Sequence, residues 1–338
     1  MNTKKIPEQF KGLLTRALLP RNNPPDLDFP RYDLTPIDHD YAAQFQIKAN
    51  YVFRTLGMDV GFVMMVGDPK KAEKIYDAFR YDPKYLGGGT GSGFKNRALV
   101  CLDMIDPLAQ RIGAVNVVAK RNGQLYGFNT DGIGFVRGLQ EFLATHFSRA
   151  YAPDGDLSLL KVLLLGAGGT ADAIAFTLAQ CGAHLSILNR TAEKAVKLVA
   201  RINAVYGPVA FGGGEELLAK EIPKADIIVN ASKKGAEGEF SDYSSFALAT
   251  EGGLEENLRQ SAEMVKLLRP GTVVCDVNLR KDESPTLRQA RLAGHFVLDG
   301  TSMNYHQAVE ALWLIHQEDF TRLKVTKEAL AKLMAAAT

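Results

Sequence analysis

Six consecutive residues could bind the phosphates of a nucleotide. They match the pattern Gly-x-Gly-x-x-Ala and are Gly166, Ala167, Gly168, Gly169, Thr170 and Ala171. Glycine is needed where a chain turns tightly and a pyrophosphate approaches the backbone, because a Cβ atom would stand in the way. The helix expected after the turn would add unpaired N–H groups and the positive end of its dipole. Such a pattern is weak evidence alone, but its place between an expected strand and an expected helix indicates a dinucleotide site.

The residues after the next expected strand indicate which dinucleotide binds. An NAD site usually has an acidic side chain there, which binds the 2′-hydroxyl of the ribose. This sequence has Asn189, Arg190 and Thr191 instead, with Lys194 one turn into the following helix. An arginine and a hydroxyl suit a dianionic 2′-phosphate, so the sequence predicts NADP. The alternative, that Thr191 only caps the helix and Arg190 is solvated, is compatible with the same residues.

Three polar segments could contact the substrate or the rest of the cofactor. Gly113-Ala-Val-Asn116 offers an amide, and Asn129-Thr-Asp-Gly132 offers the carboxylate of Asp131. The alternative for Asp131 is a helix N-cap, since a helix is expected directly after it. A third segment follows another expected strand, beside the nicotinamide ribose in this architecture, and an ordinary polar loop is its alternative. It consists of Asn230, Ala231 and Ser232.

Alternating strands and helices are expected to position the nucleotide-binding residues. Strands are expected at 161–165, 184–188, 227–229, 273–276 and 295–298, and helices at 170–181, 192–205, 255–268 and 287–293. This alternation is typical of a doubly wound parallel sheet. We therefore expect an α/β fold of two domains, in which residues 150–298 form a Rossmann-type NADP-binding domain.

The remaining residues, 1–135 plus 303–338, are expected to form an α/β substrate-binding domain. Prolines between positions 20 and 36 predict an irregular arm over residues 1–40, with one helical piece at 12–19. Apolar spacing then predicts helices at 41–56, 70–79, 98–111 and 132–147, a strand at 60–66 and a hairpin of 115–119 with 124–128. Five glycines in residues 87–93 predict a loop.

Composition excludes several classes of protein. The 338 residues carry a net charge of +2, which gives no reason to expect a nucleic acid or an anionic membrane as partner. The three cysteines are far apart in the sequence, which fits a reducing compartment. Neither they nor the scattered histidines have the spacing of a metal site. With no secretory signal and no long apolar run, we expect a cytoplasmic protein that binds a small molecule. The sequence is compatible with a homodimer but does not specify the oligomeric state.

The motifs resemble the shikimate dehydrogenase family in type and in order. The matching positions lie between about residues 45 and 316 and include segment 53–59, Asp106-Pro107, segment 112–116, Gly127, segment 129–132, Asp299-Gly300, Met303 and Gln307-Ala308. The resemblance implies an NADP-dependent dehydrogenase of the shikimate pathway of aromatic amino acid biosynthesis. It also implies that Gly300 and Met303 bind the cofactor, and that Asn116 and Gln307 hydrogen-bond the substrate.

The resemblance further implies a catalytic lysine and aspartate. The family's lysine ends a motif Asn-Val-Thr-x-Pro-x-Lys, and Lys95 stands at its spacing, eighteen residues before Gly113. Asp131 would be its partner. Hydride reduction of a ketone leaves a developing alkoxide, which an ammonium can stabilise and protonate, and a carboxylate keeps that ammonium charged and oriented. The alternative for Lys95 alone is a solvated lysine after a glycine loop.

Three departures from the family pattern concern the substrate. The family binds the substrate carboxylate with Ser-x-Ser-x-x-x-His-Asn, and this chain has residues 43–50 there, with alanine and phenylalanine for the serines. The threonine of the lysine motif is Gly91, and its neighbours Thr90 and Ser92 are expected to bind the substrate; a family tyrosine is Leu279. Hydrogen bonds to a charged group contribute about 1.5–3 kcal/mol each. Other groups must compensate, or the ligand differs; the candidates are His39, Gln44, Gln46 and Lys48.

Three functions therefore stand open. The first is NADP-dependent hydride transfer to or from a small cyclic hydroxy acid or a related compound. The second is a genuine shikimate or quinate dehydrogenase with substitute carboxylate-binding groups. The third is a dehydrogenase-like regulatory protein that binds NADP and turns over little, against which the retention of both Lys95 and Asp131 argues.

Overall fold

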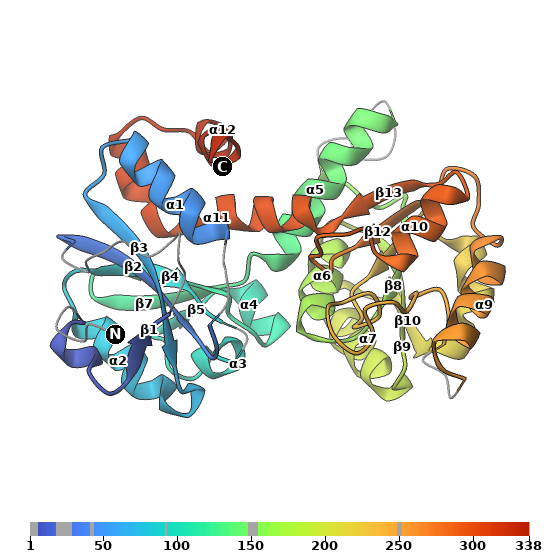
Figure 1. Ribbon diagram of the computed structural model, residues 1–338, viewed down its shortest axis with the longest axis horizontal. Coiled ribbons are helices and arrows are strands. Elements are labelled where there is room, and N and C mark those ends of the chain that lie inside the picture. The colour runs from blue at the N-terminus through green and yellow to red at the C-terminus, as the bar shows by residue number, and fades with distance from the viewer. Residues whose placement is uncertain are drawn as a thin grey trace. The chain divides into compact units, whose positions relative to one another are not determined.

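The computed structural model describes residues 6–17, 29–40, 44–91, 93–147, 155–248 and 252–337 (Figure 1). The chain divides into two compact units. The first comprises Met1–Thr130 with Gln307–Thr338, and the second comprises Asp131–His306. The prediction of a mixed α/β chain is confirmed, because each unit is built on its own β-sheet. No helix in these described ranges is long and apolar enough to cross a membrane.

The first unit is built on a mixed seven-stranded sheet in the order β1-β3-β2-β4-β6-β7-β5. Its strands are β1 (Leu14–Arg16), β2 (Arg31–Ile37), β3 (Val60–Gly67), β4 (Tyr85–Gly89), β5 (Met104–Ile105), β6 (Val117–Arg121) and β7 (Gln124–Phe128). Its helices are α1 (Gln44–Thr55), α2 (Ala72–Tyr81), α3 (Lys95–Ala98), α4 (Pro107–Ile112) and α12 (Lys327–Ala336), with 3-10 turns η2 (Glu8–Phe10) and η3 (Pro69–Lys71). An aromatic cluster of Tyr32 on β2, Phe79 on α2 and Tyr85 on β4 packs α2 against the sheet.

The second unit is a parallel six-stranded sheet in the order β10-β9-β8-β11-β12-β13. Its strands are β8 (Lys161–Leu165), β9 (His184–Asn189), β10 (Ala210–Gly214), β11 (Ile227–Asn230), β12 (Val273–Asp276) and β13 (Phe296–Asp299). Its helices are α5 (Asp131–His146), α6 (Gly169–Gln180), α7 (Ala192–Tyr206), α8 (Leu218–Glu221), α9 (Gly253–Val265) and α10 (Pro285–Leu292), with turns η5 (Glu215–Leu217) and η6 (Ile222–Lys224). This strand order is that of the Rossmann fold, in which ligands bind where the order reverses, here between β8 and β11.

One long helix, α11 (Gly300–Arg322), contributes to both units. Its first residues belong to the second unit, and the residues from Gln307 onward belong to the first. His316 interrupts it with the non-helical backbone angles φ −112° and ψ 23°. The site residues expected near its beginning, Gly300 and Met303, therefore lie in the second unit, whereas Gln307 opens the last part of the first.

The expectation of an irregular arm over residues 1–40 is wrong for the parts of this segment that the structure describes, residues 6–17 and 29–40. Residues 14–16 form β1 instead of part of a helix, and Arg31–Ile37 form β2, which lies between β3 and β4. Proline has no N–H to donate to a neighbouring strand. Pro36 is tolerated in β2 because β2 pairs with β4 only at Tyr32 and Asp33, so Pro36 lies past the end of that pairing.

Three other expectations fail for local reasons. The helix expected at 98–111 is broken, because Asp106 caps a new helix at Pro107 by accepting hydrogen bonds from Leu108 and Ala109. The first three glycines of the expected loop 87–93 belong to β4. Strand β10 was not expected, since three of its residues are glycines; Gly212 lets it pass close to α7, where an added Cβ would lie 3.0 Å from the carbonyl of Ala195.

Candidate active site

The glycine turn after β8 has the geometry that a phosphate-binding turn needs. Gly166 has φ +119°, and a Cβ atom on it would lie 2.6 Å from the carbonyl oxygen of Ala231. Its own N–H donates to Leu188 O at 2.8 Å. A Cβ on Gly168, which precedes α6, would meet nothing within 4 Å. Gly166 is therefore required by the fold itself, whereas the open space at Gly168 is available to a ligand.

A cavity of about 350 Å³ lies at this carboxyl edge of the second sheet. Nine residues expected to bind the cofactor line it: Gly166, Ala167, Gly168, Asn189, Arg190, Thr191, Lys194, Ala231 and Ser232. Asn189 Nδ2 donates to Thr191 O at 2.9 Å, which shapes the turn after β9, and the Thr191 hydroxyl makes no capping hydrogen bond to α7. The structure thus gathers both phosphate-binding motifs around one cavity.

Other residues expected to bind the cofactor are not among those that line this cavity. Gly169, Thr170 and Ala171 form the first turn of α6, Gly300 opens α11, and Met303 is buried one turn later. Asn230 is fully buried and accepts hydrogen bonds from Ser232 N at 3.1 Å and Ser232 Oγ at 2.7 Å. Asn230 Nδ2 donates to Lys234 O and to the carboxylate of Asp276 at 2.8 and 3.0 Å. Asn230 therefore shapes the loop that carries Ser232.

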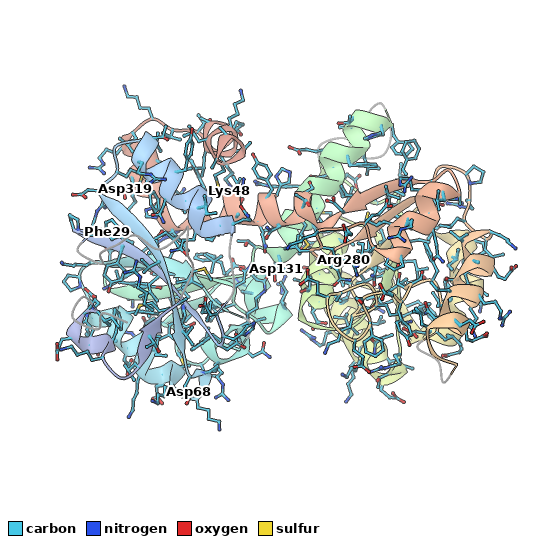
Figure 2. The ribbon with its side chains drawn as sticks, in the orientation of Figure 1. Phe29, Lys48, Asp68, Asp131, Arg280 and Asp319 are labelled. Atoms are coloured by element: carbon cyan, nitrogen blue, oxygen red, sulfur yellow. The ribbon has the colours of Figure 1, made fainter. Side chains whose placement is uncertain are left out.

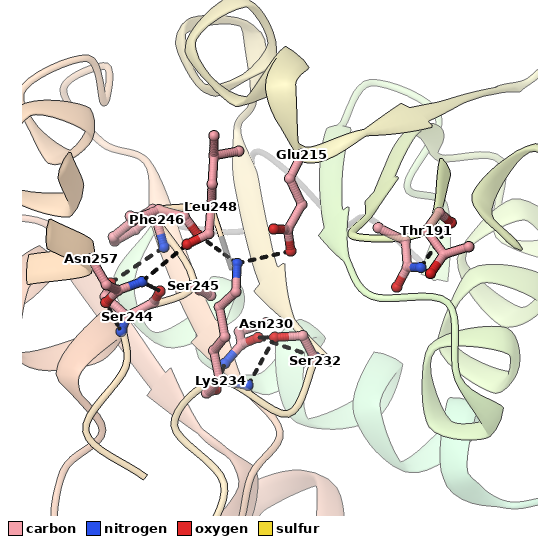
Figure 3. Close-up of polar contacts among 12 residues, drawn as sticks. Thr191, Glu215, Asn230, Ser232, Lys234, Ser244, Ser245, Phe246, Leu248 and Asn257 are labelled. Atoms are coloured by element: carbon pink, nitrogen blue, oxygen red, sulfur yellow. Dashed lines mark hydrogen bonds and ion pairs between the residues drawn. The ribbon is translucent and has the colours of Figure 1, made fainter. Parts of the chain in front are cut away.

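Sequence reasoning missed a buried ion pair in the same cavity (Figure 3). Lys234 is only 5% exposed, and its Nζ donates to Glu215 Oε1 at 2.8 Å and to Ala247 O. Burial lowers the pKa of Lys234, and the charge of Glu215 opposes that shift. A lysine four residues past the end of β11 was a usable signal. Glu215 had none, because β10, which it follows, was itself not expected.

In the first unit, backbone hydrogen bonds connect Lys95 to the Gly-Ala-Val-Asn segment. Val115 N donates to Lys95 O at 3.0 Å. Thr90 N donates to Asn116 O at 2.9 Å, and the buried Thr90 hydroxyl donates to Val115 O. Lys95 begins α3 and is half-buried. Ser92, also expected at the site, lies outside the described residues.

Side-chain amides then join the two polar segments. Thr130 N donates to Asn116 Oδ1 at 2.9 Å, and Asn116 Nδ2 donates to Thr130 Oγ1 at 3.1 Å. Asn129 Nδ2 donates to Ala114 O at 3.0 Å. The next residue, Asp131, is 5% exposed and begins α5 (Figure 2). A Cβ on Gly132 would lie 2.2 Å from Ala173 O, so this glycine lets α5 approach α6.

Two of the residues considered as substitutes for the missing serines serve the fold instead. Lys48 on α1 donates to Met334 O and Ala337 O at the end of α12, at 3.0 and 3.2 Å (Figure 2). Gln46 is fully buried and donates to Phe62 O at 3.1 Å. Gln44 is exposed, and His39 pairs with the neighbouring Asp38. Phe45, which replaces a serine, packs edge-on against Phe62 with ring centroids 4.9 Å apart.

Comparison with known proteins identifies the family. Residues 36–118 match the shikimate dehydrogenase substrate binding domain, and residues 149–236 match the shikimate / quinate 5-dehydrogenase domain. A shikimate dehydrogenase (NADP(+)) of Bacillus cereus (strain 03BB102) is 34% identical over 298 residues, which cover 86% of this chain and 93% of that protein. The chain belongs to the shikimate dehydrogenase family. The predictions of this family and of an oxidoreductase are confirmed.

Solved structures agree with this assignment. Shikimate 5-dehydrogenase from Listeria monocytogenes, solved with shikimate and NAD, has a TM-score of 0.70 at 25% identity and covers 90% of this chain and 96% of its own. Quinate dehydrogenase from Corynebacterium glutamicum, solved with NAD, also has a TM-score of 0.70 at 25% identity and covers 90% and 98%. The prediction of two α/β domains, one of them Rossmann-type, is confirmed by the family and by these structural neighbours.

Proposed function

We propose that this shikimate dehydrogenase family member transfers hydride between NADP(H) and a hydroxyl or ketone of a small cyclic hydroxy acid or a related compound. Lys95 and Asp131 form its catalytic pair. One observation supports this most directly: hydrogen bonds connect Lys95 through Val115 and Asn116 to Thr130, the residue before Asp131. Residues 1–130 with 307–338 would bind the substrate, and the Rossmann-type unit would bind NADP.

The charges around the nucleotide cavity support NADP as the cofactor. Its lining side chains include four cations, Arg190, Lys194, Lys233 and Lys234, and one carboxylate, Glu215. A dianionic 2′-phosphate at the end of β9 would form charge-assisted hydrogen bonds with Arg190. The acidic residue that NAD sites usually have at this position is absent, because the residues there are Asn189, Arg190 and Thr191. The curated relatives are named for NADP(+), which agrees with this assignment. Two structural neighbours were solved with NAD, so the fold alone does not distinguish the two cofactors. The residues at the end of β9 decide for NADP in this chain.

The proton chemistry falls to Lys95 and Asp131. NADPH, when bound, supplies the hydride to the carbonyl carbon. The ammonium of Lys95 stabilises the charge that develops on the carbonyl oxygen and donates a proton to that oxygen, which completes the alcohol. In the reverse direction Lys95 accepts the hydroxyl proton. The carboxylate of Asp131 orients the ammonium. The carboxylate's neighbours in the proposed site, Asn116 and Gln307, hold the other hydroxyl groups, together with Thr90 and Ser92, which precede Lys95 in the sequence.

The substrate departs from the family pattern at its carboxylate end. Both serines are replaced, and Gln46 and Lys48 donate to backbone carbonyls within the unit. The carboxylate of Asp38 lies next to Gly93, two residues before Lys95. A Cβ atom on Gly93 would be 2.9 Å from Asp38 Oδ2. A negative charge at this position would repel the carboxylate of a substrate such as shikimate. These contacts favour a related hydroxy compound over shikimate itself. The 34% identity to a shikimate dehydrogenase keeps shikimate or quinate turnover as the second candidate.

A substrate panel tests the proposal. Reduction of NADP⁺ would be measured with shikimate, quinate, other ring hydroxy acids and neutral cyclic polyols. Turnover of a compound other than shikimate and quinate at the higher kcat/KM supports the proposal, and a preference for shikimate or quinate supports the second candidate. Tight NADP⁺ binding without turnover of any compound would instead indicate a regulatory protein. Restoring the serines with Ala43→Ser and Phe45→Ser is expected to raise kcat/KM for shikimate about tenfold or more, since each hydrogen bond to the carboxylate contributes about 1.5–3 kcal/mol.

Arg190→Ala tests the cofactor assignment. Because the arginine would bind the 2′-phosphate, we expect KM for NADPH to rise about tenfold to hundredfold, with little change in KM for NADH. Lys197→Ala, an exposed charge change on the same helix α7, is the matched control and should change neither value. An equal effect of Arg190→Ala on both cofactors would refute the assignment.

A further inference from the structure

The ion pair of Glu215 and Lys234 lines the nucleotide cavity, and the function proposed above gives it no specific contact with the cofactor (Figure 3). Its two side chains are 13% and 6% exposed. Glu215 follows β10, and Lys234 reaches toward it from the loop after β11. Buried ion pairs lose much of their attraction to desolvation and are weak evidence for stability. A cavity-lining pair of this kind is better explained by what it binds.

The backbone around Lys234 holds its ammonium in place. Its second acceptor, Ala247 O, belongs to a turn fixed by Asn257, whose Oδ1 accepts from Ser244 N at 2.8 Å and whose Nδ2 donates to Ser244 O at 3.1 Å. Asn230 Nδ2 donates to the backbone of Lys234 at 2.8 Å. A lysine ammonium has three N–H groups, and the described residues supply two acceptors for this one. The third N–H can serve a ligand in the cavity.

Glu215 is the carboxylate among four cations that line this cavity. A carboxylate beside the phosphates of a dinucleotide would repel them, so the part of the ligand that fits next to Glu215 is an uncharged group that donates hydrogen bonds. The exocyclic amine of adenine is such a donor, and the neighbouring ring nitrogen N1 is an acceptor. An acceptor next to a donor, as in Glu215 and Lys234, complements that edge of the base.

Strand order places this pair at the adenine end of the dinucleotide. The pyrophosphate turn follows β8, and Arg190 follows β9, the next strand outward. Glu215 follows β10, one strand farther in the same direction. A dinucleotide whose pyrophosphate lies at β8 and whose 2′-phosphate lies at β9 extends its base toward the end of β10.

We propose that Glu215 and Lys234 recognise the edge of the adenine ring, with Glu215 accepting from the exocyclic amine and Lys234 donating to N1. The proposal rests on the proposed function, because NADP must occupy this cavity. Glu215 and Lys234 would then select for adenine over other bases, whereas Arg190 selects for the 2′-phosphate. A base that reverses both hydrogen-bonding groups should therefore bind poorly.

The hypoxanthine analogue of NADP⁺ tests this directly, because a carbonyl replaces the amine and N1 carries a hydrogen. We expect the wild-type protein to bind NADP⁺ about tenfold to hundredfold more tightly than the analogue, as measured by titration calorimetry. Glu215→Gln should reduce this ratio to about threefold or less, because an amide can present either a donor or an acceptor. Glu216→Gln, an exposed neighbour that does not line the cavity, is the matched control and should keep the wild-type ratio.

A second variant covers the case in which Glu215→Gln fails to fold with Lys234 unpaired. The double variant Glu215→Gln/Lys234→Met removes both charges, and it must also lose the base preference. A wild-type protein that binds both nucleotides equally, or a preference that survives in the variants, overturns the inference. If NADP⁺ still binds and Arg190→Ala still weakens it, the proposed function stands. If neither nucleotide binds at all, the proposed function and the inference both fail.

Discussion

Lys95→Met is expected to lower kcat about 10²–10⁴-fold while NADP⁺ affinity stays within about twofold of wild type. Methionine keeps most of the side-chain volume but has no proton to give and no charge to stabilise the alkoxide. The backbone contact from Val115 N to Lys95 O does not depend on the side chain, so the local structure should persist. Single-turnover rates with the best substrate of the panel would measure the loss, and titration calorimetry would measure NADP⁺ binding.

Arg97→Met is the matched control for this loss. Arg97 lies on the same short helix α3 and is exposed, so its replacement should leave kcat unchanged. Asp131→Asn should lower kcat in the same direction as Lys95→Met, and the double variant should lose little more than either single variant, since the two residues act as a unit. Retention of near wild-type kcat in Lys95→Met would rule out this lysine as the proton donor.

The nucleotide half was predictable because its signals are local. The turn from Gly166 to Ala171 sits between a strand and a helix that are adjacent in sequence, and Gly166 has the positive φ that its residue type permits. The end of β9 is equally local, since Asn189, Arg190 and Thr191 follow directly from an apolar strand. The parallel sheet followed from the alternation of strands and helices, and its order agrees with that expectation.

Contacts between distant segments were not predictable from sequence patterns. The sequence makes Lys48 a candidate ligand of the substrate, yet its partners are backbone carbonyls near the C-terminus, those of Met334 and Ala337. Lys234 meets Glu215 only because β10 lies beside β9, and β10 has the glycines that normally argue against a strand. Strand β2 was missed because prolines before it suggested a break, although its burial between β3 and β4 outweighs that local preference.

Removal of one partner from a buried ion pair in the first unit is expected to destabilise the protein strongly. His316 Nε2 lies 2.7 Å from Asp33 Oδ2, and both side chains are fully buried. The rings of Phe53 and Phe320 pack edge-on against the imidazole at 4.9 and 5.9 Å. Burial by itself lowers the pKa of His316, but the carboxylates of Asp33 and Asp319 outweigh it and raise that pKa to about 9. We therefore expect the histidine to be charged at neutral pH, and it connects α11 at its kink to β2.

Asp33→Asn is expected to reduce the free energy of unfolding by about 3–5 kcal/mol at pH 7, because it leaves a buried imidazolium without its main counterion. The control Asp77→Asn removes an exposed partner of Arg80 and should cost less than about 1 kcal/mol. Urea unfolding at pH 7 would measure both values. A loss for Asp33→Asn no larger than that of Asp77→Asn would show that the buried pair contributes little.

The same histidine predicts how stability depends on pH. Its pKa is higher in the folded state, about 9, than the ordinary value of 6.5, so its contribution is fully present below about pH 6.5 and is lost as the pH rises through 9. His316 and Arg31 hold the pKa of Asp319 below its ordinary value, and that contribution is constant over this range because it is lost only in acid. Wild-type protein should therefore lose stability between pH 6.5 and 9, and Asp33→Asn should show a flatter profile. Parallel profiles for the two proteins would mean that His316 is neutral when folded.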